Sequence, residues 1–533
     1  MAVKLRLAGF KGEIPRIHPR LLPEDASQIA RNTRLENGAL VPLNETDQVQ
    51  TLAAPALTIF KRPGGVWLSW PDVSNVVSGP VAAQRTYITG PNPPRVLGNI
   101  SLSQDYALAL PAPTVAFTVA PLGVVDPATA EGVFYTYTWL TVLDEESQPA
   151  PLSVLMVIST NITVNLSGWP TPPAGRGITH LRVYRSQTNS LGATDLYYVA
   201  QYAVGVAQPR NHALATAPLQ EIIPSTDYDP PIDTLQGITA CANGIMVAFS
   251  GKDVWFSEPY RPHAWPTKYS LSVDFEIVGV AAIGAAVIVM TNGTPYIAQG
   301  THPDAMVMQR IEQNLPCIAA RGIVDLGFTV AYPSTEGIVT ISPNTGAQMM
   351  TRTLFTRQQW ADLNAETFIA GQHIGRYIAS HLPSGAATRE ILIIDMTGEQ
   401  PYLMRSSEPA EAMFFELGTG KLYLLLSGTQ VHEWDDLAEA KKPMLWRSRL
   451  YNLPGPVNFA AILIEADGYT APNIANAVKV YADGVLRDTI TTFNEATRLS
   501  SGFLALRWEF EVIGTVTITS ISVAQSIAEL AVQ

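Results

Sequence analysis

The sequence predicts a mainly β fold: a β-propeller interrupted by a fibronectin type III-like β-sandwich, with a sandwich-like C-terminal domain and a short N-terminal arm carrying one helix. Two observations predict it. Short apolar segments rich in β-branched and aromatic residues recur along most of the chain, separated by turns containing Gly, Pro, Asn or Asp. Strand–turn–strand segments also recur every 42 to 48 residues from Ile245 to Trp434, close to the ~40–50 residues of a propeller blade.

Composition indicates several domains and a large subunit interface. The 533 residues exceed one ordinary domain, so we expect three or four units of roughly 100–200 residues each. Hydrophobic residues make up 47% and charged residues only 15%, against about 25% in a typical soluble domain. A membrane span is excluded, because the longest apolar run, Val278–Met290, is well short of the ~20 residues required. An obligate oligomer is therefore expected.

Charge and cysteine content limit the possible partners. The net charge of −12 argues against a protein that wraps DNA, but it suits the wall of a channel through which DNA slides, because a negative wall repels phosphates. Cys241 and Cys317 have no metal-ligand or C-x-x-C spacing. Together with Lys4 and Arg6 inside the apolar N-terminal stretch, which argue against a signal peptide, they predict folding in a reducing cytoplasm.

Residues 1–45 are predicted to form the arm and its helix. Pro23 suits the first turn of a helix, the apolar residues that follow share one helical face, and Asn37-Gly38 supplies a left-handed stop. From Met1 to Arg34 there are seven basic and three acidic side chains. The alternatives are a solvated, frayed terminus and a docking arm for an acidic neighbour.

Residues 46–105 and 232–442 are predicted to form the propeller. Each hairpin joins two apolar strands through a turn that contains glycine. The hairpins are Leu57–Trp70, with Arg85–Gly90 as a further strand of that blade, Ile245–Phe256, Ala286–Ala298, Phe328–Ile341, Tyr377–Ile394 and Leu422–Trp434. Only Gln359–Phe368 suggests another short helix.

Residues 106–231 are predicted to form the sandwich insert, and residues 443–533 the C-terminal β domain. In the insert, turn clusters recur every 8–15 residues or so, as in a sandwich. Its expected strands are Phe134–Val142, Leu152–Ser159, Ile162–Leu166, Ile178–Tyr184 and Leu196–Tyr202. Those of the C-terminal domain are Val457–Glu465, Ala477–Ala482, Phe503–Phe510 and Thr515–Val523, with a hairpin turn at Asp483-Gly484.

An enzyme is the main rival class, because propeller glycosidases carry paired carboxylates at the centre of the ring. The alternative is that each carboxylate lies on a solvated strand face or turn, and Trp434-Asp435-Asp436 is interpreted as a turn that ends a strand. His263 is expected to pack in a loop, and no zinc-binding, P-loop or nucleophile-elbow motif occurs. The candidate carboxylates are Asp253, Glu258, Asp274, Glu276, Glu336 and Glu433.

A third reading is a carbohydrate-binding protein that recognises a host receptor. The ten Trp and nineteen Tyr side chains could line sugar-binding platforms. The alternative is that they fill the cores of β-sheets, where aromatic residues are enriched. We expect no cofactor and no metal, and assign no catalytic residue.

Several segments together resemble the tail nozzle, also called tail tubular protein B or tail hub, of short-tailed double-stranded DNA bacteriophages. The resemblance covers nearly the whole chain and rests mainly on the order of arm, split propeller, insert and C-terminal domain. The segments that carry it are Phe10–Pro15, Tyr137–Trp139, Glu146–Ser153, Leu181–Ser186, Phe249–Pro259, Arg261–Pro266, Trp446–Arg449 and Trp508-Glu509.

This resemblance implies a structural, non-enzymatic protein of the virion tail, made in the host cytoplasm. It implies a homo-hexameric ring that acts as conduit and gate for genome ejection. The implied partners are other copies of the chain, adaptor and portal-proximal proteins, tail fibres or spikes, and double-stranded DNA that passes without sequence-specific binding.

Overall fold

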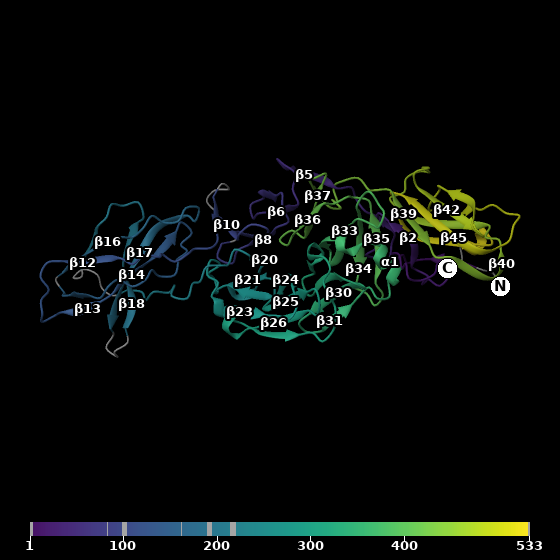
Figure 1. The fold of residues 1–533 in the computed structure, drawn as a ribbon. Helices are drawn as coiled ribbons and strands as arrows, with labels where there is room; N and C mark the ends of the chain where they lie inside the picture. The colour runs from purple at the N-terminus through teal and green to yellow at the C-terminus, as the bar shows by residue number, and fades with distance from the viewer. Residues whose placement is uncertain are drawn as a thin grey trace.

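The computed structural model describes residues 4–82, 84–98, 104–160, 162–188, 194–213 and 220–530. The molecule is elongated (Figure 1). The sandwich insert occupies one end, a stack of small sheets the middle, and a larger sheet assembly holding both termini the other end. The mainly β prediction is confirmed, and within the described residues no helix has the length and apolar character needed to cross a membrane.

The middle of the molecule repeats one unit, a four-stranded antiparallel meander. Each predicted hairpin from Ile245 onward is confirmed as the second and third strands of such a unit. The units are β8 (Asn75–Ser78), β9 (Thr86–Thr89), β10 (Arg95–Leu97) and β11 (Asp105–Ala107); β20 (Gln236–Ala240), β21 (Met246–Ser250), β22 (Asp253–Phe256) and β23 (Ser270–Ser272); β24 (Ile277–Ile283), β25 (Ala286–Thr291), β26 (Tyr296–Gln299) and β27 (Val307–Arg310); β28 (Val324–Asp325), β29 (Val330–Ser334), β30 (Gly337–Ser342) and β31 (Gly346–Met349); β32 (Ile369–His373), β33 (Arg376–His381), β34 (Glu390–Asp395) and β35 (Tyr402–Ser406).

Central strands of these units are buried on both faces, which is why they read as continuous apolar runs. In β25 all six residues are buried, as are all five in β29. The first strands of successive units also lie against one another, β8 on β20, β20 on β24, and onward through β28 and β32 to β36. The repeated units therefore pack side by side through their first strands.

The last unit is completed by a strand from far upstream. It consists of β36 (Ala412–Glu416), β37 (Lys421–Leu426), β38 (Gln430–Glu433) and β5 (Asp47–Thr51). The pair β6 (Thr58–Lys61) and β7 (Trp67–Trp70) confirms the predicted upstream hairpin and lies against β36. Arg85–Gly90 contains a strand, but β9 pairs with β8 and β10, so its assignment to the same sheet as that hairpin was wrong.

The insert is built from three small sheets around one core. All five predicted strands are present, and the core includes Tyr135, Tyr137, Trp139 and Trp169. The sheets are β12 (Thr118–Leu122), β16 (Thr163–Ser167) and β19 (Arg210–Ala213); β13 (Glu131–Val133) and β15 (Met156–Ile158); β14 (Tyr135–Thr141), β17 (Ile178–Thr188) and β18 (Thr194–Ala203).

The C-terminal region packs two sheets around the largest core. One sheet continues from the β32–β35 unit, so the middle and the C-terminal region share a single ten-stranded sheet. Its further strands are β2 (Ser27–Arg31), β39 (Met444–Ser448), β45 (Ala505–Gly514), β42 (Ala477–Ala482), β43 (Val485–Ile490) and β40 (Tyr451–Val457). The other sheet holds β1 (Leu5–Leu7), β46 (Thr517–Ala524), β41 (Ala461–Asp467) and β44 (Thr497–Arg498).

The helix predicted after Pro23 is wrong. Residues Ser27–Arg31 form β2, which joins β35 to β39, and β3 (Thr33–Arg34) pairs with β4 (Val41–Pro42). The spacing of apolar residues in this short segment fits a strand as well as a helix, and the tertiary pairing decides between them. Gly38 adopts the predicted left-handed conformation, with φ of 80°, but in the β3–β4 connection.

The helical content is confined to short pieces. The predicted helix near Gln359–Phe368 is confirmed as α1 (Arg357–Asp362) followed by a 3-10 turn, with a capping box between Thr356 and Gln359. The chain ends its described part with α2 (Ile527–Leu530). The 3-10 turns are η2 (Ala242–Gly244), η3 (Thr267–Tyr269), η4 (Pro303–Ala305), η5 (Ala320–Gly322) and η6 (Ala365–Thr367).

Candidate functional site

The first strands of neighbouring units enclose a cavity of about 690 Å³. Its wall is formed by β8, β20, β24 and β28, and Asp325 is the one ionisable side chain in that lining. Asp325 Oδ1 accepts a hydrogen bond from the Gly327 N–H at 2.7 Å. A Cβ on Gly279 would lie 2.4 Å from Ile323 Cδ1, so a larger residue at this position would displace the end of the Ile323 side chain. The cavity is a space between sheets whose walls carry one charge.

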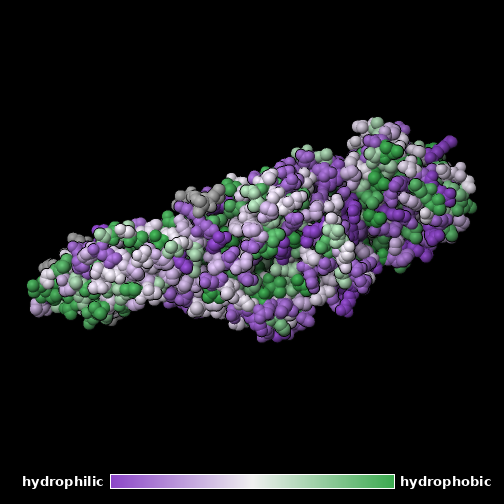
Figure 2. All heavy atoms as spheres, turned by 45° about the horizontal axis from the view of Figure 1, so that its top comes forward, coloured by the Kyte–Doolittle hydropathy of each residue, from purple (hydrophilic) through white to green (hydrophobic). Residues whose placement is uncertain are grey.

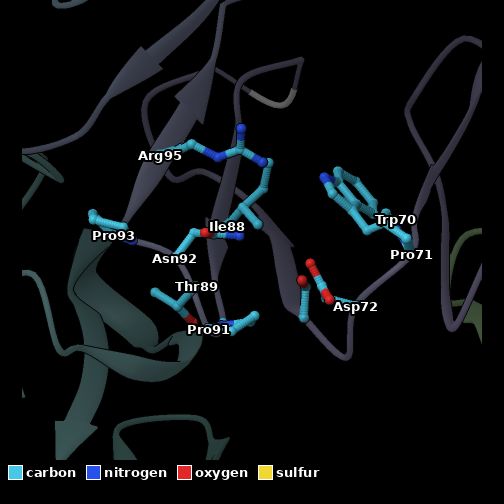
Figure 3. Close-up of a pocket in the computed structure, with 11 residues that line it drawn as sticks. Trp70, Pro71, Asp72, Ile88, Thr89, Pro91, Asn92, Pro93 and Arg95 are labelled. Atoms are coloured by element: carbon cyan, nitrogen blue, oxygen red, sulfur yellow. The ribbon is translucent and has the colours of Figure 1, made fainter.

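A second, smaller cavity of about 190 Å³ lies beside β9 (Figure 3). Trp70 and Asp72 stand on one side of it, and Asn92 and Arg95 on the other. Arg95 is already paired, with Nη1 2.6 Å from Asp105 Oδ2. The volume is below the roughly 300–1,000 Å³ of typical small-molecule sites, so we assign no ligand to it.

The six carboxylates proposed for a glycosidase do not line the large cavity. Asp274 accepts hydrogen bonds from Tyr296 at 2.9 Å and Arg310 at 3.0 Å, and Glu433 pairs with Lys421 at 2.7 Å. The Glu433 pair links the neighbouring strands β38 and β37 and is a cross-strand pair. Asp274 lies in the connection from β23 to β24, and its two partners lie on β26 and β27.

The other four carboxylates are equally dispersed. Asp253 on β22 accepts a hydrogen bond from Ser272, and Glu258 accepts one from Tyr269 at 2.9 Å. Glu276 lies in the connection from β23 to β24, and Glu336 in the turn between β29 and β30. The six predicted candidates are therefore spread over β22 and the loop after it, the β23–β24 connection, the β29–β30 turn and β38.

Asp435 behaves as the sequence predicted for a turn. It has a positive φ of 53° directly after β38. Its carboxylate accepts hydrogen bonds from the backbone and side-chain nitrogens of Asn44 at 2.8 and 3.0 Å, and it also pairs with Arg34. Asp435 therefore ties the β38 turn to the N-terminal segment.

His263 and the two cysteines are buried and packed. His263 Nε2 lies 3.1 Å from the Glu146 carbonyl oxygen, and burial lowers the pKa of His263 to about 3. Cys241 and Cys317 are both free and buried, and burial raises the pKa of the Cys317 thiol to about 12. Among the described residues, no three His, Cys, Asp or Glu side chains form a group that could hold a metal ion.

The junction between the insert and the β8–β11 unit contains a buried charge pair that the sequence did not reveal. Glu145 follows β14, and its Oε1 atom lies 4.0 Å from Arg85 Nη1, next to β9. Within the part of the chain that is described, Glu145 Oε1 has no hydrogen-bond partner. Burial raises the pKa of Glu145 to about 7, and the charge of Arg85 opposes that shift. The sequence indicates only that Glu145 belongs to a turn over Asp144–Pro149.

The adjacent Glu146 is fully partnered. Its carboxylate accepts hydrogen bonds from Thr138 at 2.7 Å, Tyr184 at 2.6 Å and Arg182 at 3.1 Å. These partners lie on β14 and β17, so Glu146 links strands within the insert. Its carbonyl oxygen reaches His263, which belongs to the loop after β22. The two neighbouring glutamates therefore serve different junctions.

Comparison with known proteins identifies no family. No family model and no curated protein matches the chain. Among solved structures, the extracellular domain of a hybrid two-component system from B. thetaiotaomicron matches at 7% identity and a TM-score of 0.28, covering 81% of this chain and 44% of that one. The chain thus spans less than half of that protein.

Two further structures are equally distant. The dihydro-heme d1 dehydrogenase NirN matches at 13% identity and a TM-score of 0.25, covering 73% of this chain and 76% of that one. PorZ, a surface component of the type-IX secretion system of Porphyromonas gingivalis, matches at 10% identity and a TM-score of 0.21. The match covers 85% of this chain and 53% of PorZ. None of these similarities bears on function.

Proposed function

We propose that this protein is a structural subunit of a virus particle, the nozzle or hub of the tail of a short-tailed bacteriophage. Copies of the chain would form a closed six-membered ring that conducts and gates the genome. The observation that carries the proposal is the arrangement of sheets: the repeated four-stranded units are interrupted once by the insert and completed by β5 from the N-terminal region.

A β-propeller accounts for this arrangement. In a propeller, blades pack side by side around a central space and a strand from one end of the chain completes the last blade. The first strands of the units pack in sequence, and β5 joins β38 in the way that such closure requires. We therefore propose that the units are blades and that the cavity bounded by β8, β20, β24 and β28 lies at their centre.

The chemistry of the described residues supports a mechanical role. Four of the six candidate carboxylates, among them Asp274 and Glu433, are bound by nearby side chains, and the lining of the large cavity contains one ionisable residue. Large apolar side chains are exposed at both ends of the molecule, among them Val124 and Leu504. Such surfaces favour coverage by another protein subunit.

The acidic balance is compatible with DNA as a passing partner. Each chain carries a net charge of −12, so a ring would repel phosphates and keep the duplex from adhering. DNA would then pass without sequence-specific contacts, and adaptor proteins and fibres would bind the outer surfaces of the ring.

The direct test is the mass of the assembled protein. Purified full-length chain, alone and mixed with the other tail proteins of its particle, is measured by native mass spectrometry. We expect a species of six copies in at least one of these mixtures. A single-copy species in every mixture would overturn the proposal, and release of reducing sugar from host capsule would favour the glycosidase instead.

A further inference from the structure

The free end of the insert exposes a cluster of aliphatic side chains, here called the insert patch. Val124 is 95% exposed, Val154 75% and Leu155 60%. The patch consists of Leu122, Val124, Leu152, Val154, Leu155 and Val157. Figure 2 shows apolar residues gathered at this end of the molecule. Monomeric proteins rarely leave such surfaces uncovered.

Strand geometry places these side chains on one surface. In β15, Met156 and Ile158 are buried while Val157 between them is exposed, as the alternation of a strand requires. β12, which ends at Leu122, packs against β15. The patch is therefore the outer face of two adjoining strands and the loops that follow and precede them.

The patch side chains themselves carry no charge. Residues 106–125 and residues 147–175 contain no Asp, Glu, Lys or Arg, and together they include all six patch residues. The nearest charges are the exposed Asp126, which follows Val124 by two residues, and Glu131 on β13, which pairs with β15. The whole chain carries −12, so two copies repel each other wherever their charged surfaces meet, and the six patch residues add nothing to that repulsion.

A closed ring needs a second, different surface to receive the patch, because head-to-tail contacts join unlike faces. One hollow of about 540 Å³ fits this requirement. Its lining includes Phe328, Ile283 and Pro343, contains no ionisable residue, and leaves the Phe328 side chain 65% exposed. We call it the Phe328 groove.

The apolar residues of the C-terminal region fit less well. Leu486 and Leu506 are exposed there, but the charged Asp488 lies two residues along β43 from Leu486 and therefore shares its face of the strand. Docking the patch on that surface would desolvate charges without giving them partners. The Phe328 groove carries no such cost.

We propose that the insert patch of one copy docks in the Phe328 groove of the next copy. This proposal rests on the proposed ring and identifies the surfaces that close it. The recognition is shape-based and apolar, with aliphatic side chains of the patch covering the Phe328 ring. The insert would then act as a bracket between neighbouring copies.

Site-directed cross-linking tests the contact in the full-length chain. Val124→Cys and Asn344→Cys are prepared as separate variants, because Asn344 lies at the rim of the groove and is exposed. The native Cys241 and Cys317 are buried, so they do not compete for oxidation. Mild oxidation should give a covalent dimer when the two variants are mixed and none when either is oxidised alone.

Controls separate this proposal from its alternatives. Ile474→Cys replaces a residue that is 88% exposed in the C-terminal region, and its mixture with Asn344→Cys should give no dimer. A dimer from Val124→Cys alone would show a patch-to-patch contact and overturn the proposal. If a sample that forms rings gave no dimer between Val124→Cys and Asn344→Cys, the proposed contact would also be overturned, while the proposed function would stand.

Charge substitution gives an independent readout. Val124→Asp and Phe328→Asp should each raise the concentration at which copies assemble by at least about tenfold, while Ile474→Asp should leave it unchanged. All three side chains are exposed, so the melting temperature of each variant should stay at the wild-type value. Unchanged assembly in Val124→Asp and Phe328→Asp would overturn the proposal, whereas failure of wild-type protein to assemble would overturn the proposed function.

Discussion

Two buried glutamates show how differently this chain attaches its parts. Glu13 lies where the N-terminal segment meets β35, and both of its oxygens are partnered: Oε1 accepts from the Ala30 N–H at 2.9 Å and Oε2 from Arg405 at 3.1 Å. Glu145 lies where the insert meets the β8–β11 unit, and its Oε1 has only the more distant Arg85. Burial raises the pKa of both carboxyl groups.

The difference between the two junctions lies in the partners of the carboxyl groups. Arg405 bridges Glu13 and Glu390, and His381 and Arg31 also approach Glu390 at 3.4 and 3.5 Å. The hydrogen bond from His381, together with the two arginines, lowers the pKa of Glu390, and Arg405 opposes the burial that raises the pKa of Glu13. At the insert junction, the neutral form of Glu145 is the stable one below a pH of about 7. Protonation of Glu145 is therefore coupled to folding at the insert junction.

The largest effect is expected at the N-terminal junction. Arg405→Met would leave Glu13 and Glu390 without their shared cation, at a cost of about 3–5 kcal/mol in the free energy of unfolding. Urea unfolding at pH 7 measures it. The matched control is Arg6→Met, because Arg6 and Glu465 form a pair that is about half exposed and should cost less than about 1 kcal/mol. If Arg405→Met and Arg6→Met lowered the free energy of unfolding equally, burial would not distinguish the two ion pairs.

The next effect concerns Glu145 itself. Its pKa is raised from 4.5 to about 7 on folding, so its stabilising contribution is complete below pH 4.5 and is lost as the pH rises through 7. Glu145→Gln removes this loss and should make the protein more stable than wild type by up to about 3 kcal/mol at pH 8. The gain should vanish near pH 4.5, and a gain that persists there would contradict this explanation.

The contribution of His263 to folding stability depends on pH in the opposite direction. Its pKa falls from 6.5 to about 3 on folding, so its contribution is present above pH 6.5 and is lost as the pH falls. Between pH 4.5 and 6.5 the contributions of Glu145 and His263 should cancel. His263→Asn should therefore gain stability on acidification across this window, by about 1.4 kcal/mol per pH unit relative to wild type. If the free energy of unfolding changed with pH in the same way in wild type and His263→Asn, the cancellation between Glu145 and His263 would be refuted.

The smallest effect is expected for Arg85→Met at pH 6. Glu145 is then largely neutral, so the substitution leaves no buried charge, and the main loss is the hydrogen bond from Arg85 to the Leu143 carbonyl oxygen. We expect a cost of about 1–2 kcal/mol in the free energy of unfolding by urea, smaller than the cost of Arg405→Met. A loss as large as that of Arg405→Met would mean that Glu145 is ionised at pH 6.

Local patterns predicted much of the fold, because a hairpin needs only two apolar strands and a suitable turn. The units around Gly251 and Gly428 followed from that signal, as did the hairpin at Asp483-Gly484. The partners of β2 and β5 did not, because they lie hundreds of residues away. Ala26 and Ala30 are buried by those distant strands, and their helical spacing was accidental.

The candidate site was harder to predict for the same reason. The six carboxylates were chosen for residue type, and the side chains that bind four of them leave no mark in the local sequence pattern. The sequence indicates only that Glu145 belongs to a turn over Asp144–Pro149, because the nearby Arg85 and Tyr87 belong to a segment that precedes the insert. Burial by a distant element leaves no local pattern, which is why this junction was missed.

The central claim is that copies of this chain form a ring around a channel. Electron cryomicroscopy of the purified full-length protein, with and without the other tail proteins of its particle, tests it most directly. The account predicts end-on class averages with six-fold symmetry and an open centre, with each insert touching the neighbouring copy. Averages that contain only separate elongated molecules in every sample would contradict it.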